Sequence, residues 1–133
     1  MHIFSQKKFI MKNMPAIKWL KAPEVHDYPA ALSYLRLLYA DAAASVLVEK
    51  LKTSEPADFK AKDILRASQL LVLPGDNIHL VADLKKIKKA ISLSPILLVR
   101  DSANERVIIA DGYHRVCAVY SLDEDIVVPC RIV

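Results

Sequence analysis

The DGYHR stretch at Asp111–Arg115 constrains the fold of this chain more than any other part of its sequence. It follows the apolar run Val107–Ala110 and precedes the apolar run Val116–Tyr120, which predicts a strand, a tight turn and the start of a helix. A glycine lets the backbone approach a ligand, and the first N–H groups of a helix lack partners within the helix. His114 and Arg115 add side-chain donors. The stretch therefore predicts a site for an oxyanion such as phosphate.

Further strands are predicted on both sides of this turn. Pro95–Val99 and Val107–Ala110 are β-type runs joined by a polar segment, which is typical of an antiparallel hairpin. The run Ile126–Val133 predicts another strand, and Pro129 favours an edge position or a bulge because proline has no N–H for a ladder. The apolar run Leu70–Leu73 is a fourth strand candidate.

The first half of the chain has a helical pattern. Apolar residues from Tyr28 to Val46 recur in steps of four and three, which predicts a helical region over Pro29–Lys52, with a break at Asp41 and Asp27 as a cap. The Thr53–Pro56 stretch ends this pattern.

Two shorter helices are expected after it. One covers Lys60–Ala67 and the other Leu80–Ile91, the latter following a turn at Pro74–Asn77 in which Asp76 or Asn77 acts as the cap. Among the connections, Lys52–Phe59 is predicted from its composition to be the one most weakly held by contacts with the rest of the chain.

These elements predict one α+β domain, in which a helical N-terminal half packs on a small mixed sheet. A chain of 133 residues with 53% hydrophobic residues has the size and apolar content for one core. We divide it into an N-terminal extension (1–14), a helical part (15–69) and a sheet-containing part (70–133).

Bulk properties limit the classes of function. No run reaches the ~20 apolar residues of a membrane span, and residues 1–14 lack the pattern of a secretion signal. Cys117 and Cys130 form no metal or disulfide pattern, which favours a reducing, cytoplasmic setting. The net charge of +4 is modest, and the one lysine cluster, Lys85–Lys89, is expected to be a solvated helix face.

The order of elements after residue 70 resembles the ParB/sulfiredoxin superfamily, in particular the ParB N-terminal domain. The resemblance is carried by Leu93–Val99 before the hairpin, by Ile109–Arg115 at the helix start, and by Val128–Ile132 as a closing strand with a central proline. It implies nucleotide binding, with Gly112 permitting close approach and His114 and Arg115 contacting phosphate oxygens.

The sequence also departs from the families in this group. Sulfiredoxins have a reactive cysteine after the loop glycine, where this chain has Tyr113, so sulfiredoxin chemistry is not expected. Partition proteins continue from the closing strand into a DNA-reading domain, whereas this sequence ends at Val133, so a complete partition protein is not expected. Free-serine kinases of the group need an acidic base, for which Asp76 and Asp83 are the candidates.

The residues of the turn each have two interpretations. Asp111 is expected either to hold Mg²⁺ or to bond its own backbone in an Asx-type turn. His114 and Arg115 are expected to contact the ligand, the alternative being a solvent-facing pair at the helix start. Tyr113 either stacks on a base or packs against the core. Cys117 is expected to be buried.

The preceding helix start adds further candidates. His79 is a second donor or a structural residue, and Asn77 is a cap before it is a ligand. Metal binding by His26, His79 and His114 has no ligand spacing behind it.

The sequence therefore predicts a protein that binds a nucleoside triphosphate with Mg²⁺, or another phosphorylated small molecule, at residues 112–115. Hydrolysis or phosphoryl transfer would place Asp111 and His114 in the catalytic roles. The alternative is a non-catalytic module whose nucleotide switches contacts to a protein or to DNA, although the sequence has no DNA-reading domain. A nuclease is the weakest interpretation, because no carboxylate cluster suits two metals.

Overall fold

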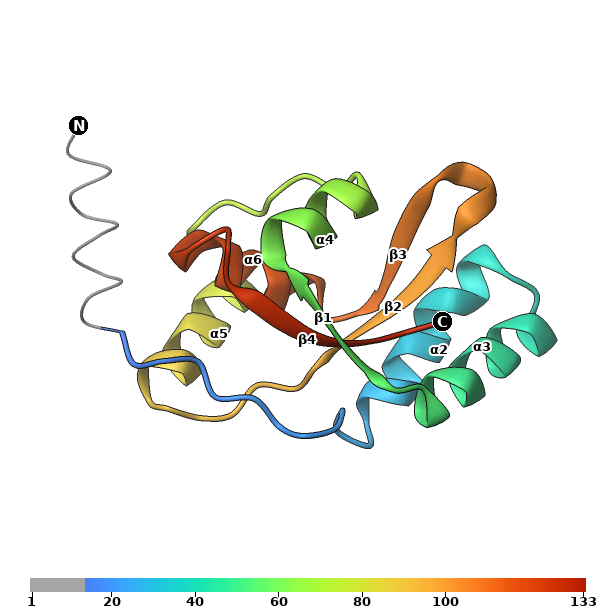
Figure 1. Cartoon of the computed structure of the whole chain (residues 1–133), viewed down its shortest axis with the longest axis horizontal. Helices are drawn as coiled ribbons and strands as arrows, with labels where there is room; N and C mark the ends of the chain where they lie inside the picture. The colour runs from blue at the N-terminus through green and yellow to red at the C-terminus, as the bar shows by residue number, and fades with distance from the viewer. Residues whose placement is uncertain (1–13) are drawn as a thin grey trace.

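The computed structural model describes residues 14–133 and has a four-stranded mixed sheet at its centre (Figure 1). The strand order is β1-β4-β2-β3, in which β4 pairs with β1 antiparallel and with β2 in parallel, while β2 and β3 form an antiparallel hairpin. The strands are β1 (Pro56–Lys60), β2 (Ile96–Asp101), β3 (Arg106–Asp111) and β4 (Val127–Ile132). The predicted α+β class and hairpin are confirmed. The expected extension at 1–14 lies, apart from Met14, outside the described residues.

Helices cover both faces of this sheet (Figure 1). The alternation of side chains along β2 divides the core: Leu97 and Val99 pack with α2 and α3, whereas Ile96 and Leu98 pack with α4, α5 and α6. The helices of the described part are α2 (Asp27–Leu38), α3 (Asp41–Thr53), α4 (Ala61–Ser68), α5 (Ile78–Lys88) and α6 (Tyr113–Leu122), and a 3₁₀ turn, η1 (Ser102–Asn104), joins β2 to β3. Both Cys117 and Cys130 are buried free thiols.

The predicted break near Asp41 is confirmed, because α2 ends at Leu38 and α3 begins at Asp41. The break resets the helical phase, so α3 buries Ala44, Val48 and Leu51, and the expected inward position of Val46 is wrong. The position of the α2 cap is also wrong. His26 is the N-cap residue, and Asp27 is the first residue of the helix.

The helices on either side of the Pro74–Asn77 turn, α4 and α5, are present as predicted, but their first and last residues differ from the predicted ones. The Asn77 N–H donates to the Pro74 carbonyl across the turn. The Asn77 side chain accepts from the N–H groups of His79 at 3.0 Å and Leu80 at 3.2 Å, so Asn77 is the cap of α5. The α5 helix ends at Lys88, before the half-exposed Ile91 that the pattern had included.

Three expectations about strands are wrong. Leu70–Leu73 joins no ladder and connects α4 to α5, with Leu71 86% exposed. Pro56–Lys60, expected to belong to the weakly held connection Lys52–Phe59 and to the start of the next helix, forms β1. The last strand is interior, not an edge, and Pro129 is accommodated because only Asp58 of β1 lies opposite it, the pairing with β2 starting at Cys130.

Candidate functional site

Gly112 is the N-cap of α6 and has a left-handed backbone, with φ at +106°. A Cβ atom at this position would lie 2.6 Å from Cδ1 of Ile96 and 2.9 Å from a guanidinium nitrogen of Arg115. Both the dihedral angle and the crowding therefore require glycine here. The predicted strand, turn and helix start are confirmed at this position.

The guanidinium of Arg115 is held by other parts of the protein. One nitrogen donates to Oδ2 of Asp111 at 2.5 Å, and the other donates to the carbonyl of Ser94 at 2.9 Å and lies 3.6 Å from Oδ2 of Asp27. The Ser94 hydroxyl donates in turn to Asp27. We call these four residues the Arg115 clamp, and they join the end of β3, the start of α2 and the segment before β2.

The clamp shares one cation between two carboxylates. Burial raises the pKa of Asp111, and nearby Asp27 raises it further, while Arg115 opposes both effects. The Arg115 side chain is only 13% exposed. Two of its five N–H donors are hydrogen-bonded within the protein, and its charge is shared by two carboxylates, so the guanidinium is less available to a phosphate than the sequence suggests.

A cavity of about 340 Å³ lies beside the clamp, and we call it the polar cavity. Five of the predicted site residues meet there, namely His79, Asp111, Gly112, His114 and Arg115. The remaining lining residues are Glu24, His26, Asp27, Ala30, Ala82, Asp83 and Lys86. The four carboxyl groups of the lining outnumber its two permanent cations, so imidazole protonation or a bound cation decides whether the cavity attracts an anion.

Two imidazoles from different helices meet on the wall of the polar cavity. The ring centroids of His79 on α5 and His114 on α6 are 4.6 Å apart, with the planes tilted by 46°. Burial and the neighbouring His79 lower the pKa of His114, against the opposing effect of Asp83. His114 is therefore a neutral imidazole at pH 7, able to donate from one nitrogen and accept at the other.

Asp83 is the carboxyl group of the cavity that has no hydrogen bond or ion pair to the side chains described for residues 14–133. Burial raises its pKa, while Lys86, Arg115 and both histidines act in the opposite direction. A buried carboxyl group with a raised pKa in a cleft is typical of a functional position.

Two predicted site residues have other roles. The Tyr113 hydroxyl donates to the carbonyl of Leu71, and the ring packs against the core, so Tyr113 does not line the polar cavity. Asn77 is engaged in capping α5 and does not line it either.

Sequence reasoning assigned no site role to Asp27 or Lys86. In the sequence, Asp27 is indistinguishable from an ordinary helix cap. It reaches the site through a contact with Arg115, which lies far away along the chain. Lys86 was grouped with a solvated lysine face, although the period of α5 places it one turn from Asp83 and two turns from His79 and could have indicated their shared face.

The described residues contain no group of three or more His, Cys, Asp and Glu side chains that could hold a metal ion. His26, His79 and His114 line the same cavity without forming such a group. A magnesium ion would therefore need ligand oxygens supplied by the bound molecule, which is the usual way Mg²⁺ is held with phosphates.

No protein-family model, curated protein or solved structure matches this chain. The resemblance to the ParB/sulfiredoxin superfamily stays a prediction that rests on residues 70–133. None of the helices described for residues 14–133 has both the length and the apolar character needed to cross a bilayer.

Proposed function

We propose that this protein binds a phosphorylated small molecule in the polar cavity, with a nucleoside triphosphate and Mg²⁺ as the leading ligand. The observation that carries this proposal is the meeting of His79 and His114, 4.6 Å apart, on the cavity where α6 begins. The α6 N-terminus has no side-chain cap, since Gly112 has no side chain. The N–H groups of its first turn and two imidazoles can therefore donate to one phosphate group.

The other lining residues have complementary roles in this proposal. Lys86 neutralises phosphate charge, and the free carboxyl group of Asp83 faces a Mg²⁺ ion that arrives with the phosphates. The Arg115 clamp fixes the Gly112 turn, and we assign Arg115 to positioning rather than to the main phosphate contact.

Phosphoryl transfer or hydrolysis is the activity that this arrangement supports best. Such reactions depend on positioning and on charge neutralisation. His114 and Asp83 are then the groups available to orient a nucleophile. Asp111, the acid that the sequence suggested beside His114, is already bound by Arg115.

The alternative is a non-catalytic switch, and one contact favours it. Asp27 belongs to both the Arg115 clamp and the first turn of α2. A ligand that pulls Arg115 towards its phosphate would release Asp27 and change the position of α2, which could alter a surface for a partner protein or DNA.

Calorimetric titration with ATP, CTP, ADP and inorganic pyrophosphate, each with and without Mg²⁺, tests the shared premise. We expect His79→Asn and His114→Asn to weaken binding at least tenfold. Lys86→Gln should weaken it severalfold, whereas Lys88→Gln, also on α5 but outside the cavity lining, should leave it unchanged. Absence of binding by the unaltered protein, or equal binding by all variants, would refute the proposal.

Release of inorganic phosphate, or its transfer to a small alcohol, separates the two candidates. Turnover that His114→Asn removes would identify an enzyme. Ligand binding without turnover, accompanied by a change in hydrogen exchange at α2, would identify the switch.

A further inference from the structure

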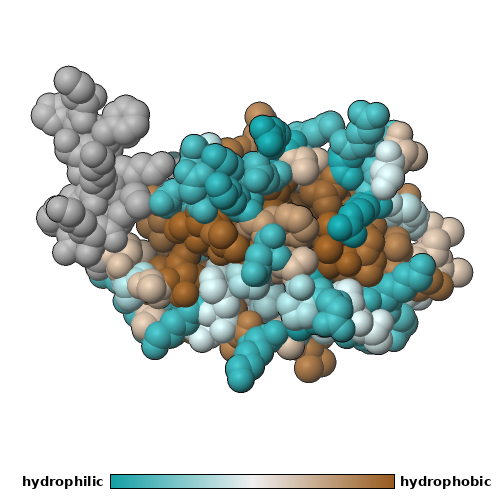
Figure 2. All heavy atoms as spheres, viewed as in Figure 1, coloured by the Kyte–Doolittle hydropathy of each residue, from teal (hydrophilic) through white to brown (hydrophobic). Residues whose placement is uncertain are grey.

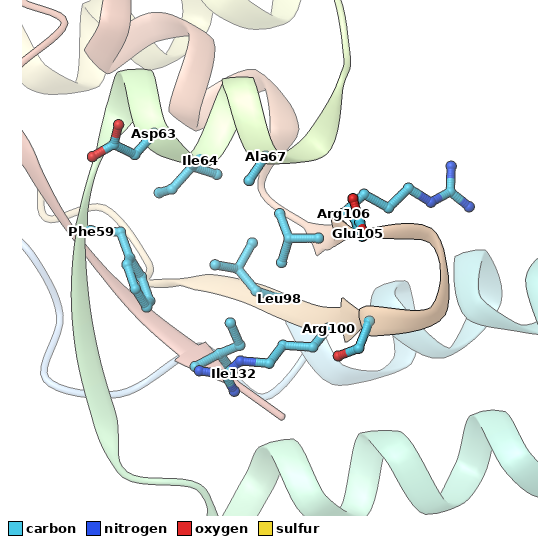
Figure 3. Close-up of a pocket in the computed structure, with 11 residues that line it drawn as sticks. Phe59, Asp63, Ile64, Ala67, Leu98, Arg100, Glu105, Arg106 and Ile132 are labelled. Carbon is cyan, nitrogen blue, oxygen red and sulfur yellow. The ribbon is translucent and has the colours of Figure 1, made fainter.

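A second hollow lies on the α4 side of the sheet, away from the polar cavity (Figure 3). Its volume is about 380 Å³. Leu98 and Ile132 lie on the sheet side of the hollow, and Ile64 and Ala67 of α4 line it on one side. Val107 of β3 also lines it. We call it the apolar groove, and its other lining residues are Phe59, Asp63, Arg100, Ser102, Glu105 and Arg106.

The stagger of the strands explains the shape of this face. The β2–β4 ladder ends at Leu98 and Ile132, apart from backbone bonds of Val133 with Leu98 and Arg100, so the end of the β2–β3 hairpin projects beyond β4. The opposite face of the hairpin is covered by α2. On the groove side α4 packs against β3. Leu98, Val107 and Ile64 are almost fully buried there, whereas Phe59 and Ile132 are partly exposed and Ala67 is exposed. Apolar residues show at the surface between hydrophilic ones in Figure 2.

The ionisable residues of the groove differ in whether they have partners. Asp63 pairs with Arg66 at 3.2 Å, and Arg106 pairs with Asp101 at 2.9 Å. Arg100 forms no ion pair and no side-chain hydrogen bond with the residues at 14–133.

The directions of these side chains separate them further. Figure 3 shows the Arg100 side chain running beside Ile132, while Arg106 extends away from the groove and Glu105 lies near Arg106 at the hairpin turn. The apolar groove therefore ends at one unpartnered guanidinium.

We propose that the apolar groove binds a small amphipathic carboxylate, with an acyl chain over Leu98, Val107 and Ile132 and its carboxylate on Arg100. A guanidinium recognises a carboxylate through two parallel hydrogen bonds. The volume is at the small-molecule end of the range of about 300–1,000 Å³ for ligand pockets. A saturated chain of medium length, about ten carbons, is the probe chosen for a hollow of this size. This inference does not depend on the polar cavity.

Titration with decanoate below its micelle concentration tests the proposal, with decanol as the uncharged comparison. We expect decanoate to bind, decanol to bind at least tenfold more weakly, and Arg100→Gln to reduce decanoate binding at least tenfold. Arg106→Gln is the matched control, because that guanidinium already has Asp101 as its partner, and its affinity should stay within twofold of the unaltered protein. Equal losses in both variants, equal binding of decanol, or no binding of decanoate would overturn the proposal.

Ala67→Phe provides a second variant that fills the groove from an exposed position on α4. It should abolish decanoate binding while leaving the circular dichroism spectrum unchanged. The same variant tests for two other occupants of the apolar groove. If it removes a concentration-dependent dimer in sedimentation, or removes retention on phosphatidylcholine vesicles, the groove belongs to a second copy or to a membrane surface, and the proposal is wrong.

Discussion

The polar cavity and the apolar groove each have an arginine on their lining, and the two arginines have opposite surroundings. Arg115 is largely buried and is held by Asp111, Asp27 and the Ser94 carbonyl. Arg100 is exposed and has no such partner among residues 14–133. The arginine within the distinctive DGYHR stretch is thus occupied within the protein, and the one on an ordinary strand is available to a ligand.

A charged residue within a distinctive sequence pattern can thus stabilise the turn in which it lies instead of binding a ligand. Buried ion pairs contribute little net stability when formed, but removal of one partner is costly because it leaves an uncompensated charge. The clamp is therefore expected to be sensitive to the loss of any one of its charged groups. The groove has no comparable dependence on Arg100.

The largest expected effect is at the glycine of the clamp. Gly112→Ala should lower the free energy of unfolding by about 4 kcal/mol, because it adds left-handed strain and overpacks Ile96 and Arg115. Gly75→Ala is the control, since an added Cβ there would meet nothing within 4 Å. Urea denaturation of both variants measures the difference, and equal stabilities would show that the turn can relax.

The next effect compares the two arginines directly. Arg115→Ala should lower the free energy of unfolding by about 3 kcal/mol, because Asp27 and Asp111 lose their shared cation. Arg100→Ala should change it by less than about 0.5 kcal/mol. If urea denaturation gives similar losses for both, the contrast between clamp and groove is wrong.

A smaller effect tests how α5 is anchored beside the cavity. Asn77→Ala should lower the free energy of unfolding by about 1 kcal/mol, because the N–H groups of His79 and Leu80 lose their acceptor. Asp76→Ala, at the exposed neighbouring position, should leave thermal stability almost unchanged. Equal shifts in the melting temperature would contradict the assignment of Asn77 as the cap.

The smallest expected effect is an increase in the free energy of unfolding, at Asp83. Burial raises the pKa of Asp83 above its unfolded value, so its contribution to stability is present below the unfolded pKa and is lost as the pH rises through the folded pKa. Asp83→Asn should therefore stabilise the protein at pH 7 by roughly 0.5–1 kcal/mol. The gain should shrink towards pH 3.5, and urea denaturation at both pH values checks it. A pH-independent change would contradict the role of ionisation.

The Gly112 turn could be predicted because its causes are local. A strand-forming run, one glycine and a helix-forming run occupy consecutive positions, and the Pro74–Asn77 turn is explained in the same way by its own residues. The two-helix division near Asp41 also follows from the local pattern.

The remaining features depend on contacts between distant segments. Pro56–Lys60 has only Ala57 and Phe59 as alternating apolar residues, too few to predict a strand, and it becomes one through pairing with β4. Leu70–Leu73 has the composition of a strand but finds no partner. Asp27 reaches Arg115 from a distant part of the chain, so the partners of the guanidinium could not be inferred from the DGYHR stretch.

The position of β4 has a consequence for the order in which the protein acquires its structure during synthesis. Since β4 lies between β1 and β2, a nascent chain that has emerged only as far as Leu122 contains β1 without a partner and the hairpin without its neighbour. Closure of the sheet requires Val127–Ile132 to have emerged from the ribosome, and its non-local pairings form slowly. Until then, the apolar residues of α4 and the hairpin are available to chaperones.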